Sequence, residues 1–81
     1  MNTIFHEQSD VQLKTMHKNL ISLRKIKGCS VDELSQALNI DIVMLTSFEN
    51  DGNLDIAVEM LFDLCRFYGV LVHRIFLPFF E

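Results

Sequence analysis

Apolar residues recur at spacings of three and four along most of the chain, and we find no convincing strand pattern. In the first third of the chain the recurring residues are Leu13, Met16, Leu20, Leu23 and Ile26. Side chains three and four positions apart lie on one face of an α-helix. The sequence therefore predicts an all-α protein.

Capping and stop signals divide this pattern into helices. The first predicted helix begins at Ser9 or Asp10 and ends before Gly28, after a basic last turn that suits the helix dipole. Residues 1–8 are left as a flexible N-terminal arm. Because the chain has only 81 residues, we expect residues 9–81 to form a single domain.

A capping box predicts the start of the second helix. In Ser30-Val31-Asp32-Glu33 the Ser30 hydroxyl can accept a hydrogen bond from the amide of Glu33, whose carboxylate can accept one from the amide of Ser30. The helix is expected to run from Val31 to Leu38. Its inner face would carry Leu34 and Leu38.

Three further helices follow from similar signals. Asp41 is an N-cap for a short helix over Ile42 to about Asn50. A fourth helix is expected from near Asp55 to Tyr68, and a short fifth one ends before Pro78. The inward positions of these helices are predicted to be Leu45, Phe48, Val58, Leu61, Leu64 and Cys65, followed by Val72, Ile75 and Phe76.

Charge is distributed unevenly over the chain. Residues 28–65 contain no Lys or Arg but eight acidic residues, whereas residues 1–27 have a net charge of +3 and the whole chain has −4. The acidic residues are Asp32, Glu33, Asp41, Glu49, Asp51, Asp55, Glu59 and Asp63. Duplex DNA binds to basic surfaces, so the central segment disfavours direct DNA binding.

Several classes of protein are disfavoured by what the sequence contains. Cys29 and Cys65 stand alone, and His6, His17 and His73 have no partners at metal-ligand or catalytic spacing. The two later histidines are expected at the surface or its rim. No apolar run reaches the length of a membrane helix, and the first residues do not resemble a signal peptide. We therefore expect a cytoplasmic protein that is not an enzyme and binds no membrane, metal or cofactor.

Residues 31–50, VDELSQALNIDIVMLTSFEN, resemble the helix-turn-helix of the Cro and phage-repressor family, also called XRE-like regulators. The matching positions are Leu34, Ser35, Leu38, Asn39, Ile40, Leu45 and Phe48. Residues 19–30 are similar to the family's first helix and the junction after it, and residues 61–76 to its closing helices. The resemblance covers about residues 19–76. It implies a compact five-helix fold of the lambda-repressor DNA-binding-domain type.

The resemblance also implies two structural contacts. Arg24 and Glu49 occupy positions that commonly form an ion pair between the first and third helices in this family. Ser35 stands where the family has a small residue, which would let the second and third helices approach closely. Both features support the fold and neither is a functional site.

For function, the resemblance implies a small dimeric transcriptional regulator, of prophage or mobile-element type, that binds operator DNA. The third helix would lie in the major groove. Its groove-facing residues would be Asp41, Ile42, Val43, Thr46 and Ser47. The sequence departs from the family at Val31, where Gln is common, and in the loop DGNLD, which lacks the usual Lys or Arg.

The residues themselves leave a second hypothesis open. Ile42, Val43 and Met44 form an apolar patch at the start of the third helix, which is more typical of a protein contact than of a DNA-reading surface. The chain could thus be a protein-interaction module, such as a modulator or antirepressor, that grips a partner regulator protein. On either hypothesis the aromatic tail predicts a homodimer interface. Its residues are Phe76, Leu77, Phe79 and Phe80.

Overall fold

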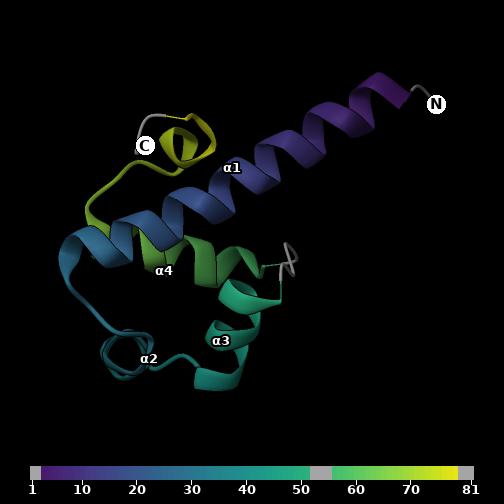
Figure 1. Ribbon diagram of the computed structural model, residues 1–81. Coiled ribbons are helices and arrows are strands. Elements are labelled where there is room, and N and C mark those ends of the chain that lie inside the picture. Colours follow the sequence, from purple (N-terminus) through teal and green to yellow (C-terminus); the bar gives the residue numbers. More distant parts are fainter. Residues whose placement is uncertain (1–2, 52–55, 79–81) are drawn as a thin grey trace.

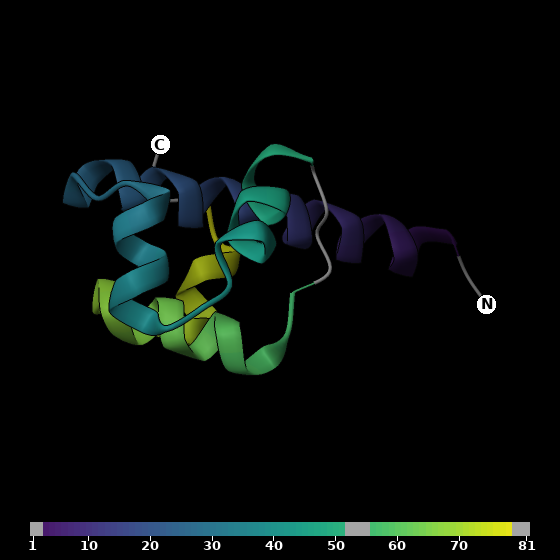
Figure 2. The same ribbon diagram turned by 90° about the horizontal axis from the view of Figure 1, so that it is seen from below.

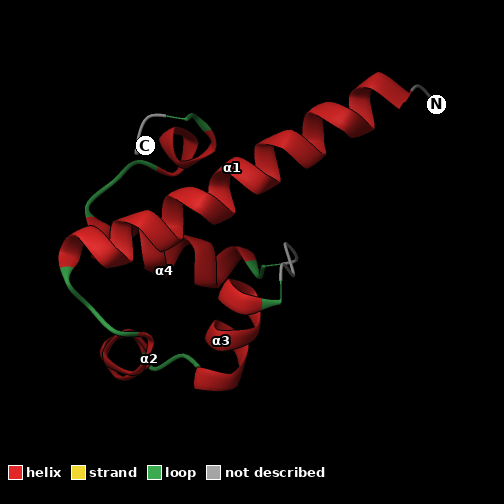
Figure 3. Ribbon diagram, in the orientation of Figure 1, coloured by secondary structure: helices red, strands yellow, loops and turns green. Residues whose placement is uncertain are grey.

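The protein folds into helices alone over the residues that the computed structural model describes, which are 3–51 and 56–78, with side chains from residue 11 onward. Most of the described residues are helical, and none is in a strand. The elements are α1 (Thr3–Lys27), α2 (Val31–Leu38), α3 (Ile42–Asn50), α4 (Val58–Tyr68) and the 3-10 helix η1 (Val72–Phe76). Figures 1 and 3 show their arrangement. The all-α prediction is confirmed.

The boundaries of α2 and α3 follow from their caps. The Ser30 hydroxyl accepts from the Glu33 amide at 3.0 Å, and the Glu33 carboxylate accepts from the Ser30 amide at 2.9 Å, which completes the predicted capping box. Asn39 ends α2 in the left-handed conformation, with φ of 55°. Asp41 caps α3 by accepting from the Val43 amide at 2.7 Å. Both helices therefore have the bounds that the sequence predicts.

The start of α1 differs from the prediction. The helix begins at Thr3, so Ser9 and Asp10 lie inside it, and residues 3–8 are helical instead of forming the expected arm. No Gly or Pro occurs between residues 3 and 27, and nothing there stops a helix from continuing past a potential cap. The N-terminal half of α1 extends beyond the other elements in both views (Figures 1 and 2). The molecule is accordingly elongated, with extents of 41 × 24 × 19 Å.

Two residues predicted to be inward are exposed. Ile26 in α1 is 72% exposed and Val58 in α4 is 64% exposed. Each lies in a terminal turn, about a quarter turn away from the middle of its helix's buried stripe. Met60 is buried in α4 where Val58 was expected. The predicted start of α4 near Asp55 is too early: the helix begins at Val58, after the non-helical Ile56 and Ala57, while Asp55 itself lies outside the described residues.

One continuous core joins all five elements. Its buried apolar residues are Met16, Leu20, Leu23, Leu34, Leu45, Phe48, Met60, Leu61, Leu64, Cys65 and Ile75. Leu38, Val72 and Phe76 are partly buried against it. The core thus contains most of the residues that the periodic spacing assigned to it.

A buried amide, which the sequence analysis did not single out, fixes the end of the chain to α1. Asn19 is 1% exposed, and its Nδ2 donates to the carbonyl oxygens of Ile75 at 2.8 Å and Leu77 at 2.7 Å. The fifth element is a 3-10 helix that ends at Phe76, because Pro78 disfavours helical backbone at Leu77, the residue before it. Asn19 therefore satisfies the carbonyls at the end of η1.

Candidate functional site

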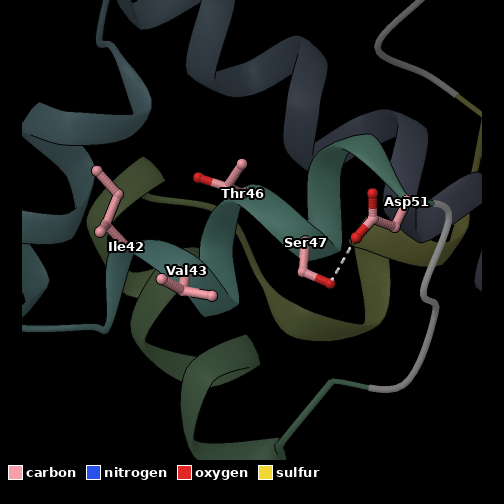
Figure 4. Close-up of a pocket in the computed structure, with 5 residues that line it drawn as sticks. All are labelled: Ile42, Val43, Thr46, Ser47 and Asp51. Atoms are coloured by element: carbon pink, nitrogen blue, oxygen red, sulfur yellow. Dashed lines mark hydrogen bonds between the residues drawn. The ribbon is translucent and has the colours of Figure 1, made fainter.

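The outward face of α3 is the surface to which the sequence points, and the structure exposes it. Leu45 and Phe48 point into the core, while Asp41, Ile42, Val43 and Thr46 are exposed and Ser47 is half-buried. Ile42, Val43, Thr46 and Ser47 line a shallow hollow of about 320 Å³ together with Asp51 (Figure 4). Four of the five predicted contact residues therefore share one hollow, and Asp41 lies at the helix start beside it.

Acidic side chains stand at both ends of α3. Asp41 is bonded to the backbone amide of Val43, and the Ser47 hydroxyl donates to the Asp51 carboxylate at 3.0 Å. Between them the hollow is lined mainly by the apolar side chains of Ile42 and Val43, of which Val43 is 71% exposed. The surface thus combines apolar contact area with negative charge.

An ion pair holds α3 against α1. Arg24 Nε and Nη2 donate to the two carboxylate oxygens of Glu49 at 2.7 and 2.8 Å. Arg24 Nη1 also donates to the carbonyl of Cys29 at 2.8 Å, which ties in the connection between α1 and α2. The hydrogen bonds to Glu49 raise the pKa of Arg24 above its usual value. The pair expected from the family resemblance is present, and its bidentate geometry fixes how α1 and α3 cross.

Two more side chains support α3 from behind. His17 of α1 is half-buried, and its Nε2 donates to the Phe48 carbonyl at 2.6 Å while its ring packs edge-on against the Phe48 ring. The carbonyls in the last turn of a helix lack donors within the helix, so α1 supplies one here. Ser35 of α2 donates to the Ile40 carbonyl and closes the connection between α2 and α3. His73, by contrast, is exposed as expected.

A groove that the sequence analysis missed lies between α3 and α4. Two hollows of about 260 and 350 Å³ share Met44, Ala57 and Met60, and we call this continuous depression the α3–α4 groove. Glu59 and Asp63 of α4 line it on one side, opposite Asp41. Only the packing of α4 beside α3 brings these residues together, so no local sequence pattern could reveal the groove.

The described residues include a buried thiol but neither a metal-binding cluster nor a membrane-spanning helix. Burial raises the pKa of the Cys65 thiol, which lies in the core and is 1% exposed. No group of three or more His, Cys, Asp or Glu side chains among residues 11–51 and 56–78 could hold a metal ion. None of the described helices has the length and apolar character needed to cross a bilayer.

Comparisons with protein-family models, with curated proteins and with solved structures find no match to this chain. The resemblance to the Cro and phage-repressor family therefore rests on the residues of this chain itself.

Proposed function

We propose that this chain is a small transcriptional regulator of the Cro and phage-repressor type, in which α2 and α3 form a helix-turn-helix and η1 is the fifth element of a lambda-repressor-like fold. The observation that carries the proposal is the split of α3 into two faces. Leu45 and Phe48 are buried, and Ile42, Val43 and Thr46 are exposed together. A helix that reads the major groove needs such a face, held on a rigid scaffold.

In this proposal α3 enters the major groove of operator DNA. The Asp41 carboxylate can accept a hydrogen bond from the amino group of cytosine, and Ile42 and Val43 can contact a thymine methyl group. The hydroxyls of Thr46 and Ser47 can form hydrogen bonds with base edges. The acidic segment supplies no phosphate contacts, so these come from the basic α1. Its lysines are Lys14, Lys18, Lys25 and Lys27. Dependence on so few cations makes DNA binding weak, and the contacts from these lysines weaken further as the salt concentration rises.

A mobility-shift assay with the DNA upstream of the chain's own gene tests this function. We expect a sequence-specific shift at low salt that weakens at moderate salt and is lost in the Thr46→Ala/Ser47→Ala double variant. Gln12→Ala, an exposed change on α1 away from α3, is the matched control and should leave the shift intact. A shift that is the same for unrelated DNA, or that survives the double variant, would contradict the proposal.

A second candidate function is a protein-interaction module on the same fold. It is favoured by the α3 face, where Ile42, Val43 and Met44 are 40%, 71% and 53% exposed beside carboxylates. In this case α3 would bind a partner regulator protein instead of DNA. Absence of any DNA shift, together with a host partner that co-purifies with the wild type but not with Val43→Asp, would support this candidate.

Both candidates include a homodimer formed through the tail. Leu77 is 49% exposed and Phe76 is half-buried against the core, while Phe79 and Phe80 lie outside the described residues. An exposed leucine beside further aromatic residues supports an interface there, since aromatic residues are enriched at interface cores.

A further inference from the structure

We propose that the α3–α4 groove binds a basic amphipathic helix of a partner protein. This inference rests on the second candidate of the proposed function and names the chemistry of the partner. Three observations carry it, namely the floor of the groove, the charge at its rim and the absence of a sheet edge in the described residues.

The floor of the groove is apolar and adaptable. Met44 is 53% exposed although its neighbours Leu45 and Phe48 are buried, and it faces Met60 and Ala57 across the groove. Ile40 and Leu38 continue the apolar lining toward α2. Methionine side chains are flexible and fit irregular apolar partners, and they are common at surfaces that take up amphipathic helices. The floor therefore suits a row of apolar side chains spaced along a helix.

The rim of the groove is negative. Asp41 stands on one side, and Glu59 and Asp63 stand on the other. No Lys or Arg occurs between residues 28 and 65, and Arg66, which lies 3.3 Å from the Asp63 carboxylate, is 77% exposed at its side chain. Lys or Arg residues flanking the apolar stripe of a partner would meet these carboxylates, while a phosphate backbone or an acidic peptide would be repelled.

The secondary structure of the partner follows from backbone hydrogen bonding. An extended peptide binds best by adding a strand to an exposed sheet edge, and residues 3–51 and 56–78 contain no strand. A helix satisfies its own backbone and needs only a groove for its apolar face. Since helices line the groove on both sides, a third helix would complete a helix–helix packing around Met44.

The test uses the full chain and a synthetic probe peptide of about fourteen residues, with Leu at positions i, i+3, i+4 and i+7 of each two turns and Lys elsewhere. A second peptide with Glu in place of each Lys is the charge control. We expect the wild type to bind the Lys peptide at least about tenfold more tightly than the Glu peptide, measured by isothermal titration calorimetry at moderate salt. Tenfold corresponds to ~1.4 kcal/mol.

Two matched variants locate the binding. Met44→Lys places a repelling charge on the floor and should weaken binding of the Lys peptide by roughly tenfold or more. Leu71→Lys makes the same change at an exposed apolar residue in the connection between α4 and η1, which is 63% exposed, and should leave the affinity within about twofold. Circular dichroism of both variants confirms that the helices are intact.

Each other outcome overturns the inference. Equal affinity for the two peptides, no binding of either, or equal losses in Met44→Lys and Leu71→Lys would show that the groove does not select a basic helix. Duplex DNA that binds to the wild type in the absence of peptide, and more weakly to Met44→Glu, would instead assign the groove to nucleic acid. A wild type that shifts operator DNA but ignores the peptide refutes this inference while the proposed regulator function stands.

Discussion

Removal of the Arg24 side chain should destabilise the fold strongly. Arg24 makes three hydrogen bonds, and the side chains of Arg24 and Glu49 are only 15% and 9% exposed. Arg24→Met leaves the Glu49 carboxylate and the Cys29 carbonyl without these donors. Loss of one partner from a buried ion pair costs about 3–5 kcal/mol, and an exposed pair contributes under about 1 kcal/mol. For this partly exposed pair we expect a loss of about 2–3 kcal/mol.

Urea denaturation followed by circular dichroism measures this loss. With a slope of about 1 kcal/mol per molar urea for a domain this small, the midpoint should fall by about 2–3 M. Arg24→Lys keeps the charge but not the bidentate geometry, so it should lose about half as much. Because the Arg24→Met/Glu49→Leu double variant leaves no unpaired carboxylate, it should recover much of the stability. A midpoint within about 0.5 M of wild type for Arg24→Met, or a double variant no more stable than the single one, would refute the reasoning.

Three further predictions concern the caps and the tail. The backbone hydrogen bond from Ser30 lowers the pKa of Glu33 below its usual 4.5, so its stabilisation is present above that value and is lost as the pH falls through the lowered pKa. The difference in urea midpoint between wild type and Glu33→Gln should therefore be full at neutral pH and vanish in acid. Asn19→Leu leaves two carbonyls without their donor and should lower the free energy of unfolding by about 2–3 kcal/mol in the same assay. The control is Gln12→Leu at an exposed position, which should change the free energy of unfolding by less than about 0.5 kcal/mol. Light scattering should find a wild-type dimer at micromolar concentration and a monomer for Leu77→Glu. A wild type that stays monomeric at high micromolar concentration would contradict the tail interface.

The sequence predicted the starts of α2 and α3 correctly because side chains within each segment define them. The side chains of Ser30 and Glu33 each accept a hydrogen bond from the backbone amide of the other residue. The Asp41 side chain accepts one from the amide of Val43, two residues later in the chain. Such signals do not depend on the rest of the fold. The start of α1 was predicted wrongly because Ser9 and Asp10 are potential caps in any context, and only the residues before them decide whether the helix continues.

The site could be predicted only in part. The exposed residues of α3 follow from its helical period once Leu45 and Phe48 are assigned to the core. The α3–α4 groove could not be predicted, because it requires knowing that Met60 of α4 lines the same hollows as Met44 of α3. Asn19 left one signal, a polar residue between Met16 and Leu20 on a face that is otherwise apolar, and its bonding partners 56 and 58 residues away could not be found locally.

Asn19 cannot form its hydrogen bonds to the carbonyls of Ile75 and Leu77 until the end of the chain has been synthesised. Ribosomes add about 5–20 residues per second, so the 56 residues from Asn19 to Ile75 take roughly 3–11 s to appear. Helical domains fold in microseconds to milliseconds once their contacts exist. For several seconds the nascent chain therefore lacks Ile75, which is fully buried against α1 and the rest of the finished core. During that interval the apolar side chains of α1 that Ile75 later covers stay accessible to chaperones and proteases.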